Sequence, residues 1–310
     1  FGNDLFGEPI KPKASGPVAE RFTLPPFTVL DARTGEWQER KRAWLTLGIS
    51  GKDGRDGELF GFSESLLQRQ GGYFEEDGTK RNTADTSVFD PVLCELAYRW
   101  FSPAGGQVVD PFAGGSVRGI VAGALGRKYW GGELRPEQIA ANETQAEDIA
   151  PSVRPVWVCG DSMETLPTAP EADFVFSCPP YGDLEKYSDD PRDLSAMDWH
   201  AFVAAYKRII LRAVGRMKPD TFACFVVGDF RDGRGFYRNF VSTTIEAFEE
   251  CGAMLYNEAI LSTMVGTAAM RVTKQFESGR KLAKTHQNVL VFCKGDWRAA
   301  AAKCNGIGNA

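Results

Sequence analysis

The sequence has few of the residues that metal centres and disulfide frameworks require. The 310-residue chain contains two histidines, His200 and His286, and its seven cysteines include no C-x-x-C pair. An odd number of widely spaced cysteines argues against a disulfide framework and a structural zinc site. No apolar run approaches the roughly 18 residues of a membrane-spanning helix. We therefore predict a cytoplasmic protein with no metal site and no membrane partner.

The sequence also lacks an excess of positive charge. It has 36 Lys and Arg against 41 Asp and Glu, a net charge of −5. A chain of this kind cannot hold a nucleic acid through its overall charge. The charges are uneven, however: basic residues concentrate in 33–42 and 271–284, and acidic residues in 183–198. A DNA or RNA substrate would have to be bound by the two basic segments.

Strand and helix patterns alternate after residue 86, which predicts an α/β fold. The expected strands cover 107–112, 128–134, 156–159, 173–178, 222–227, 253–261 and 288–292. We expect a doubly wound, mostly parallel seven-stranded sheet whose last two strands form an antiparallel edge hairpin. We divide the chain into a partly irregular N-terminal extension (1–85), a catalytic domain (86–298) and a C-terminal tail (299–310).

The motif D-P-F-A-G-G-S (Asp110–Ser116) follows the first of these strands. In doubly wound sheets, ligands bind at the carboxyl ends of the strands. Gly114 and Gly115 allow the backbone to approach a ligand closely, which a Cβ atom would prevent. The chain lacks both G-x-G-x-x-G and a P-loop lysine here, which disfavours nucleotide phosphates.

Acidic residues stand at the ends of the next two expected strands. Glu133 lies about 20 residues beyond the glycine pair, where a carboxylate can bind both ribose hydroxyls. Asp161 follows the third strand, where it could accept a hydrogen bond from an adenine amino group. Together the two carboxylates predict an adenosine pocket.

The fourth expected strand ends in F-V-F-S-C-P-P-Y (Phe174–Tyr181). The double proline fixes the backbone and offers carbonyl acceptors without N–H donors. Tyr181 adds a flat face on which a planar group can stack. This combination suits the exocyclic amino group of a flipped base, held for attack on a methyl donor.

In this order, the motifs resemble those of S-adenosylmethionine-dependent DNA amino-methyltransferases, which methylate the amino group of cytosine or adenine. The similarity covers roughly 86–295, phage-encoded members with a short C-terminal part look closest, and the motif order resembles the gamma arrangement. The resemblance implies a class I, Rossmann-like fold, S-adenosylmethionine as cofactor (S-adenosylhomocysteine as product) and DNA as partner. It implies cofactor contacts from Thr86, Ser87, Phe89, Asp110, Pro111, Phe112, Ala113, Gly114, Gly115, Ser116, Glu133, Asp161 and Ser162. The implied catalytic residues are Ser177, Cys178, Pro179, Pro180 and Tyr181.

Cys178 departs from the family pattern, which usually has Ser, Asp or Asn before Pro-Pro-aromatic. A thiol is a weak acceptor, so Ser177 or the Pro179 carbonyl must carry more of that role. If S-C-P-P-Y behaves like S-P-P-Y, cytosine N4 is favoured over adenine N6. Three alternatives stay open: a carbon-5 methyltransferase with Cys178 as nucleophile, an RNA or protein-amide methyltransferase, and a non-catalytic cofactor-binding subunit that binds DNA.

Two basic clusters are the expected DNA contacts, because phosphates must be held while a base is flipped out. The cluster residues are Arg271, Lys274, Arg280, Lys281 and Lys284 near the C-terminus, and Arg40 and Lys41 beside Trp37 and Trp44. The acidic stretch Gly182–Ser195 is interpreted as a flexible lid over the base pocket. The oligomeric state stays open.

Overall fold

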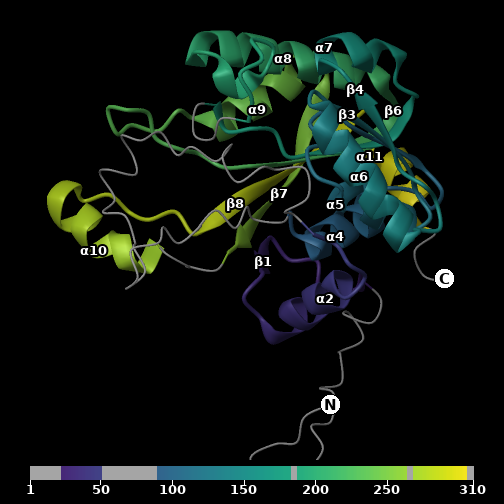
Figure 1. The fold of residues 1–310 in the computed structure, drawn as a ribbon, viewed down its shortest axis with the longest axis horizontal. Helices are drawn as coiled ribbons and strands as arrows, with labels where there is room; N and C mark the ends of the chain where they lie inside the picture. The colour runs from purple at the N-terminus through teal and green to yellow at the C-terminus, as the bar shows by residue number, and fades with distance from the viewer. Residues whose placement is uncertain (1–21, 51–88, 183–186, 264–267, 306–310) are drawn as a thin grey trace, which may run out of the picture.

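A computed structural model describes residues 22–50, 89–182, 187–263 and 268–305. At its centre is an eight-stranded sheet in the order β1-β7-β8-β6-β5-β2-β3-β4 (Figure 1). The strands are β1 (Val29–Asp31), β2 (Gln107–Asp110), β3 (Lys128–Glu133), β4 (Val156–Cys159), β5 (Ala172–Ser177), β6 (Met217–Val227), β7 (Ala253–Ser262) and β8 (His286–Lys294). Only β8 runs antiparallel to its neighbours, β6 and β7.

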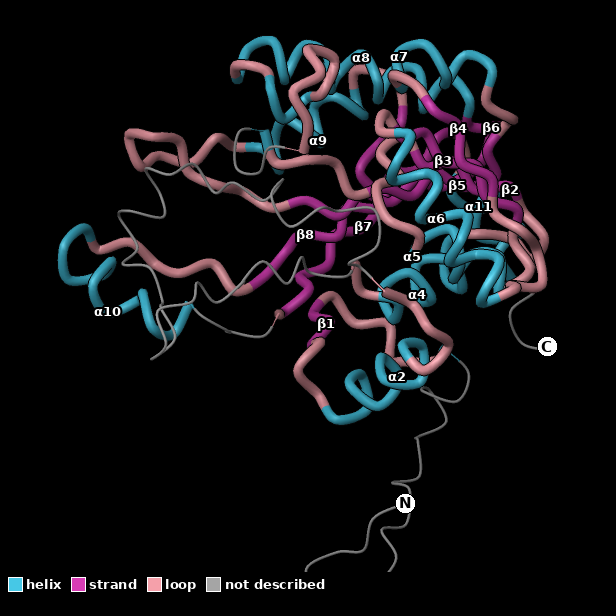
Figure 2. Tube along the Cα trace, viewed as in Figure 1, coloured by secondary structure: helices cyan, strands magenta, loops and turns pink. Residues whose placement is uncertain are grey.

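Helices cover both faces of the sheet (Figure 2). They are α2 (Gly35–Leu45), α4 (Pro91–Phe101), α5 (Val117–Ala124), α6 (Pro136–Ile149), α7 (Ser162–Thr165), α8 (Trp199–Arg216), α9 (Phe240–Glu249), α10 (Ala268–Gly279) and α11 (Trp297–Cys304), with short 3-10 helices η1 (Leu166–Thr168) and η3 (Leu194–Ala196). Several begin at aspartate caps: Asp90 accepts hydrogen bonds at the start of α4, and Asp198 at the start of α8. Among the described residues, no helix is long and apolar enough to cross a membrane.

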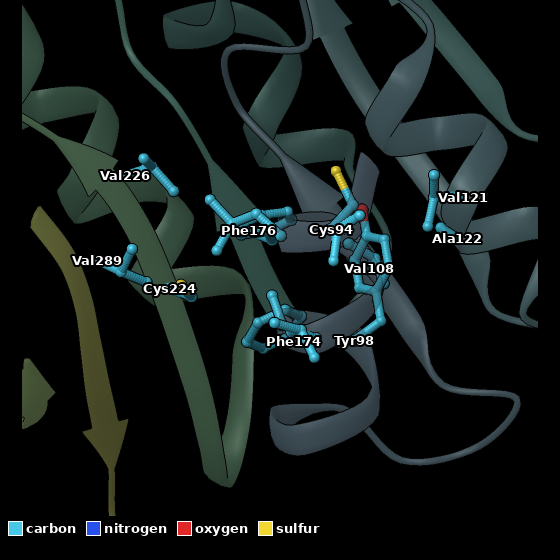
Figure 3. Close-up of a cluster of buried hydrophobic side chains, with 14 of the residues drawn as sticks. Cys94, Tyr98, Val108, Val121, Ala122, Phe174, Phe176, Cys224, Val226 and Val289 are labelled. Atoms are coloured by element: carbon cyan, nitrogen blue, oxygen red, sulfur yellow. The ribbon is translucent and has the colours of Figure 1, made fainter. Parts of the chain in front are cut away.

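The core lies in two layers because alternate residues of each central strand point to opposite faces. In β5, Phe174 and Phe176 pack under α4 with Tyr98, at ring-centroid distances of 6.2 and 5.4 Å from it (Figure 3). Val175, between them, packs on the other face with α8 and α9. The near-continuous apolar run in this strand is therefore buried on both sides.

The structure confirms the doubly wound, mostly parallel sheet with an antiparallel edge. The order β4-β3-β2-β5-β6-β8-β7 is the Rossmann-like fold of class I methyltransferases that the resemblance implies. The predicted strand number, seven, is wrong by one. Residues assigned to the extension supply β1, which pairs in parallel with β7, Val29 opposite Ile260. The exposed edge of β7 gives this short segment its hydrogen-bonding partner.

Two further expectations differ from the structure. The helical pattern of the sequence starts at residue 236 and predicts a helix from there, but α9 begins only at Phe240, because the residues before it form a tight turn with a bridge between Arg231 and Tyr237. Part of the expected tail belongs to α11, whose Ala300 and Cys304 are buried against the core. The domain boundaries themselves stay a prediction, although β1, α2 and α11 all pack on the catalytic domain.

Glu95 on α4 binds two side chains of α2 and so holds this helix against α4. The carboxylate is buried and accepts two hydrogen bonds from Arg40, at 2.6 and 2.5 Å. It also accepts from Trp44 Nε1 at 2.8 Å and Arg99 Nε at 2.9 Å. Burial alone would raise the pKa of Glu95, but hydrogen bonds from Arg40 and Trp44 outweigh it and lower the pKa. The ionised carboxylate thus stabilises the docked helix.

We expect Glu95→Gln to lower the free energy of unfolding by about 2 kcal/mol at neutral pH, because the amide cannot accept from all these donors. A group whose pKa is lowered by folding stabilises the native state above its unfolded pKa. The deficit should therefore shrink as the pH falls below about 4.3, the ordinary pKa of a glutamate, because the unfolded chain then takes up a proton that the native carboxylate binds only at lower pH. Urea denaturation across pH measures this. Glu147→Gln, which breaks the exposed pair with Arg154, is the control, and an equal effect of both changes would contradict the assignment.

Candidate active site

A cavity of about 780 Å³ lies at the carboxyl ends of the parallel strands. This volume lies within the range of small-molecule and cofactor sites. Its wall is formed by the turn after β2, the ends of β3, β4, β5 and β6, the start of β8 and part of α2. The cavity is thus lined both by the predicted cofactor motifs and by Cys178–Tyr181, which we call the catalytic turn.

Asp110 organises this cavity from behind its wall. Its buried carboxylate accepts hydrogen bonds from Arg118 Nε at 2.6 Å, Tyr129 Oη at 2.7 Å and the Phe112 backbone N–H at 3.1 Å. The Ser177 hydroxyl also donates to it. Asp110 is therefore placed to position the loop rather than to contact a cofactor, since it does not line the cavity.

Sequence reasoning missed Arg118, the counter-ion of Asp110. Its guanidinium donates to the carbonyls of Phe112 and Ala113, and lies 4.6 Å from the ring centroid of Phe89. Burial by itself would lower the pKa of Arg118, but the nearby Asp110 carboxylate outweighs burial and raises it. Arg118 therefore stays charged and fixes the carbonyls of the turn.

Glu133 lies at the cavity end of β3. Its carboxylate accepts hydrogen bonds from the backbone N–H groups of Gly114 at 3.0 Å and Arg135 at 2.9 Å. Gly114 has φ +52°, a left-handed conformation that favours glycine. Burial raises the pKa of Glu133. The carboxylate is thus oriented into the cavity by two backbone groups, with lone pairs left for a ligand.

Asp161 and Ser162 complete the expected cofactor side. Asp161 lines the cavity and caps α7 by accepting from the Met163 N–H at 2.8 Å. The Ser162 hydroxyl donates to the Pro111 carbonyl, which ties the end of β4 to the turn after β2. Of the remaining expected residues, Phe89 and 111–116 line the cavity, whereas Thr86 and Ser87 lie outside the described residues.

Four of the five expected catalytic residues line the cavity, and Ser177 does not. Its side chain is fully buried and its hydroxyl donates to Asp110, so it positions the strand end. The Ser177 hydroxyl, which the sequence offered as a side-chain acceptor for the substrate amino group, therefore points away from the cavity. Tyr181 accepts a hydrogen bond from Gln287 Nε2 at 2.8 Å, and its ring meets Phe230 edge-on at 6.1 Å. Burial raises the pKa of Tyr181, which keeps its hydroxyl neutral.

The far wall contains residues that the motifs did not indicate: Asp229, Phe230, His286 and Gln287. They come from the end of β6 and the start of antiparallel β8, which reach the same edge of the sheet. Of the expected lid, Tyr187 and 192–194 lie in the wall, while 183–186 lie outside the described residues. No group of three or more His, Cys, Asp or Glu that could hold a metal occurs in the part of the chain that is described.

The expected DNA contacts fall into two groups. Arg40 pairs with Glu95, and Lys41 pairs with Asp90 at 3.1 Å while lining the cavity, so both are held within the fold. Lys284 lines the cavity, and burial lowers its pKa. The remaining residues on and after α10 whose side chains are described are exposed: Lys274, Arg280 and Lys281. The side chain of Arg271 is outside the described part.

No protein-family model and no curated protein sequence matches the chain. Solved structures that resemble it include TrmN from Thermus thermophilus (15% identity, 68% of this chain and 51% of that one, TM-score 0.46). A second is precorrin-6y C5,15-methyltransferase from Geobacter metallireducens, with 11% identity over 73% of this chain and 95% of that one and a TM-score of 0.44. A third is magnesium protoporphyrin IX methyltransferase from Synechocystis with bound SAM, with 10% identity over 62% of this chain and 71% of that one and a TM-score of 0.40. The chain spans about half the length of TrmN. Identities and scores this low describe a likeness of fold and no more.

The residues of the cavity fit S-adenosylmethionine. Glu133 and Asp161 offer carboxylate acceptors at neighbouring strand ends, as ribose hydroxyls and an adenine amino group require. The paired Lys41 and Asp90 offer one charge of each sign, which suits the zwitterionic methionine end. Gly114 and Gly115 have open space where a Cβ would stand, so the backbone there is accessible.

We expect Glu133→Gln to weaken binding of S-adenosylhomocysteine by about tenfold or more, because an ionised acceptor is replaced by a neutral amide. Binding to the native protein should weaken as the pH is lowered, and at a higher pH than for an ordinary glutamate, because burial raises the pKa at which this carboxyl takes up a proton. Isothermal titration calorimetry measures both effects. Glu143→Gln, on the exposed face of α6, should leave affinity unchanged, and a pH dependence that persists in Glu133→Gln would contradict the assignment.

Proposed function

We propose that this protein transfers a methyl group from S-adenosylmethionine to the exocyclic amino group of a base in DNA, cytosine N4 in preference to adenine N6. One observation carries the proposal: Cys178–Tyr181 and the cofactor residues Gly114, Glu133 and Asp161 line the same cavity. A methyl donor and its acceptor must share such a space, because direct transfer requires the reacting atoms to be in contact. DNA and the base preference rest on the resemblance of the motifs.

In the proposed reaction, the chain's own residues bind and orient. Glu133 accepts from the ribose hydroxyls and Asp161 from the adenine amino group, while Lys41 and Asp90 bind the methionine end. The bound cofactor supplies an electrophilic methyl group. Asp110 accepts from both the turn after β2 and Ser177, so a methionine end bound at that turn would lie near Cys178–Tyr181.

The catalytic turn supplies acceptors to the attacking amino group. Pro179 and Pro180 have no N–H, so the backbone here presents carbonyl oxygens without competing donors. Hydrogen bonds from the amino group to these oxygens increase electron density on its nitrogen and favour attack. Tyr181 is held by Gln287, Phe230 and Phe240, so its ring forms a fixed wall for the base. No covalent intermediate with the protein is needed.

Transfer of labelled methyl groups from S-adenosylmethionine to mixed-sequence DNA tests the proposal. We expect label in DNA, recovered as N4-methylcytosine by nucleoside mass spectrometry. Label in RNA or protein alone would support one of the alternative substrates, and cofactor binding without any transfer would support a non-catalytic subunit. Either result overturns DNA amino methylation.

Cys178 lines the cavity, and this observation favours the carbon-5 alternative as the second candidate. The two chemistries make opposite predictions for Cys178→Ser. Amino methylation should persist within about tenfold, since the thiol is only a weak acceptor. Carbon-5 methylation should be abolished because the thiolate must attack the ring. Cys251→Ser, which changes a cysteine away from the cavity, is the control.

A further inference from the structure

A short hairpin between β6 and α9 projects beyond the carboxyl edge of the sheet, on the same side of the molecule as α10 (Figure 2). We call it the 229–238 hairpin. Asp229 and Phe230 at its base line the cavity. The Phe230 carbonyl accepts from the Arg238 N–H at 2.9 Å, and the Phe236 carbonyl accepts from the Asp232 N–H at 2.8 Å. The tip of the hairpin is therefore connected to the cavity wall by continuous hydrogen-bonded backbone.

The tip is ordered by its own polar groups. The Asp232 carboxylate accepts from the backbone N–H groups of Arg234 and Phe236, both at 3.0 Å, and from Arg234 Nε at 3.1 Å. Arg231 donates to the Gly235 carbonyl at 2.9 Å, and its guanidinium lies 4.0 Å from the ring centroid of Tyr237. These contacts fix the turn without help from the hydrophobic core.

Phe236 stands at this ordered tip with 69% of its surface exposed. Holding a large apolar side chain in water contributes nothing to the stability of the fold. What distinguishes this ring is its place on a hydrogen-bonded turn beside the cavity, from which an aromatic side chain can stack on or insert between planar groups.

The surroundings of Phe236 are positively charged. The hairpin contains three arginines and two acidic residues, Asp229 at its base and Asp232 within its turn. Arg234 pairs with Asp232, and the guanidinium of Arg238 lies 5.0 Å from the ring centroid of Trp199. Lys281 lies against the hairpin, since a Cβ on Gly235 would be 2.8 Å from its Nζ. Lys284 continues this surface into the cavity wall. Clustered Arg and Lys around an exposed ring suit a polyanion with stacked planar groups, that is, a nucleic acid.

We propose that Phe236 is a wedge that enters a DNA duplex and fills the space left by the flipped base, while the surrounding cations hold the phosphates. This inference rests on the proposed function and adds how the base is extracted. Apolar side chains inserted between base steps offset the cost of unstacking. Phe236 lies two residue pairs beyond Phe230, about 7 Å along the hairpin. This distance is short enough for the ring to enter the duplex at the position from which a base moves into the cavity.

The test compares Phe236→Ala with the native protein on a duplex and on a single strand of the same sequence. On the duplex, we expect kcat/KM to fall by about tenfold or more, because unstacking costs a few kcal/mol. On the single strand, where no base must be extruded, the two proteins should agree within about twofold. With 2-aminopurine at the target position, the fluorescence gain on binding should be smaller for the variant. Phe236→Trp should restore duplex activity.

The matched control is Phe27→Ala, which removes a ring of almost equal exposure, 70%, next to β1. It should leave both substrates unaffected, and S-adenosylhomocysteine affinity should be unchanged in every variant. Equal activity of Phe236→Ala and the native protein on duplex DNA would overturn the wedge and leave the proposed function standing. The wedge would also be overturned if Phe236→Ala lost activity equally on duplex and single-stranded DNA, or if the native protein were active on single strands alone. Absence of transfer to any DNA would instead refute the proposed function.

Discussion

The buried carboxylate of Asp110 is the group on which the geometry of the site depends. Its four donors come from the turn after β2, from α5, from β3 and from the end of β5. A buried charge is tolerated only when it is paired and hydrogen-bonded, so these elements must take up their positions together. Because Ser177 directly precedes Cys178–Tyr181, the proposed catalytic turn, the same carboxylate ties the turn after β2 to that segment.

This dependence explains why Asp110 and Ser177 belong to the site without forming its surface. Tyr129 likewise is buried and acts from behind the wall, whereas Arg118, also buried, reaches the cavity lining. Many of the residues that face the cavity lie in turns at strand ends, where the backbone is free to present N–H groups and carbonyls, and helices such as α2 supply others. The division follows from the doubly wound sheet: strand interiors hold the buried network, and strand ends hold the ligand.

The sequence predicts those parts of the protein that local patterns encode. All seven strands between residues 107 and 294 could be placed, because most are short, largely apolar runs bounded by turn residues. The motif residues Gly114, Glu133 and Asp161 could be assigned to one pocket, since parallel strand ends share an edge. Partners distant in the sequence could not be found: Glu95 selects Arg40 across 55 residues, and β1 joins β7 only because that edge is open. Local periodicity carries no information about such pairs.

The distribution of cations shows how an acidic chain can present a basic surface. Arg40 and Arg118 neutralise carboxylates inside the fold, so their charges are not offered to a partner. Arg231 and Lys281 instead lie at the 229–238 hairpin beside the cavity, where the carboxylate of Asp232 pairs with Arg234. The net charge of −5 therefore describes the whole chain and not the local charge beside the cavity at the carboxyl ends of the strands. If the proposed nucleic acid binds there through a few phosphate contacts, its affinity would depend only weakly on salt, because few counterions would be released.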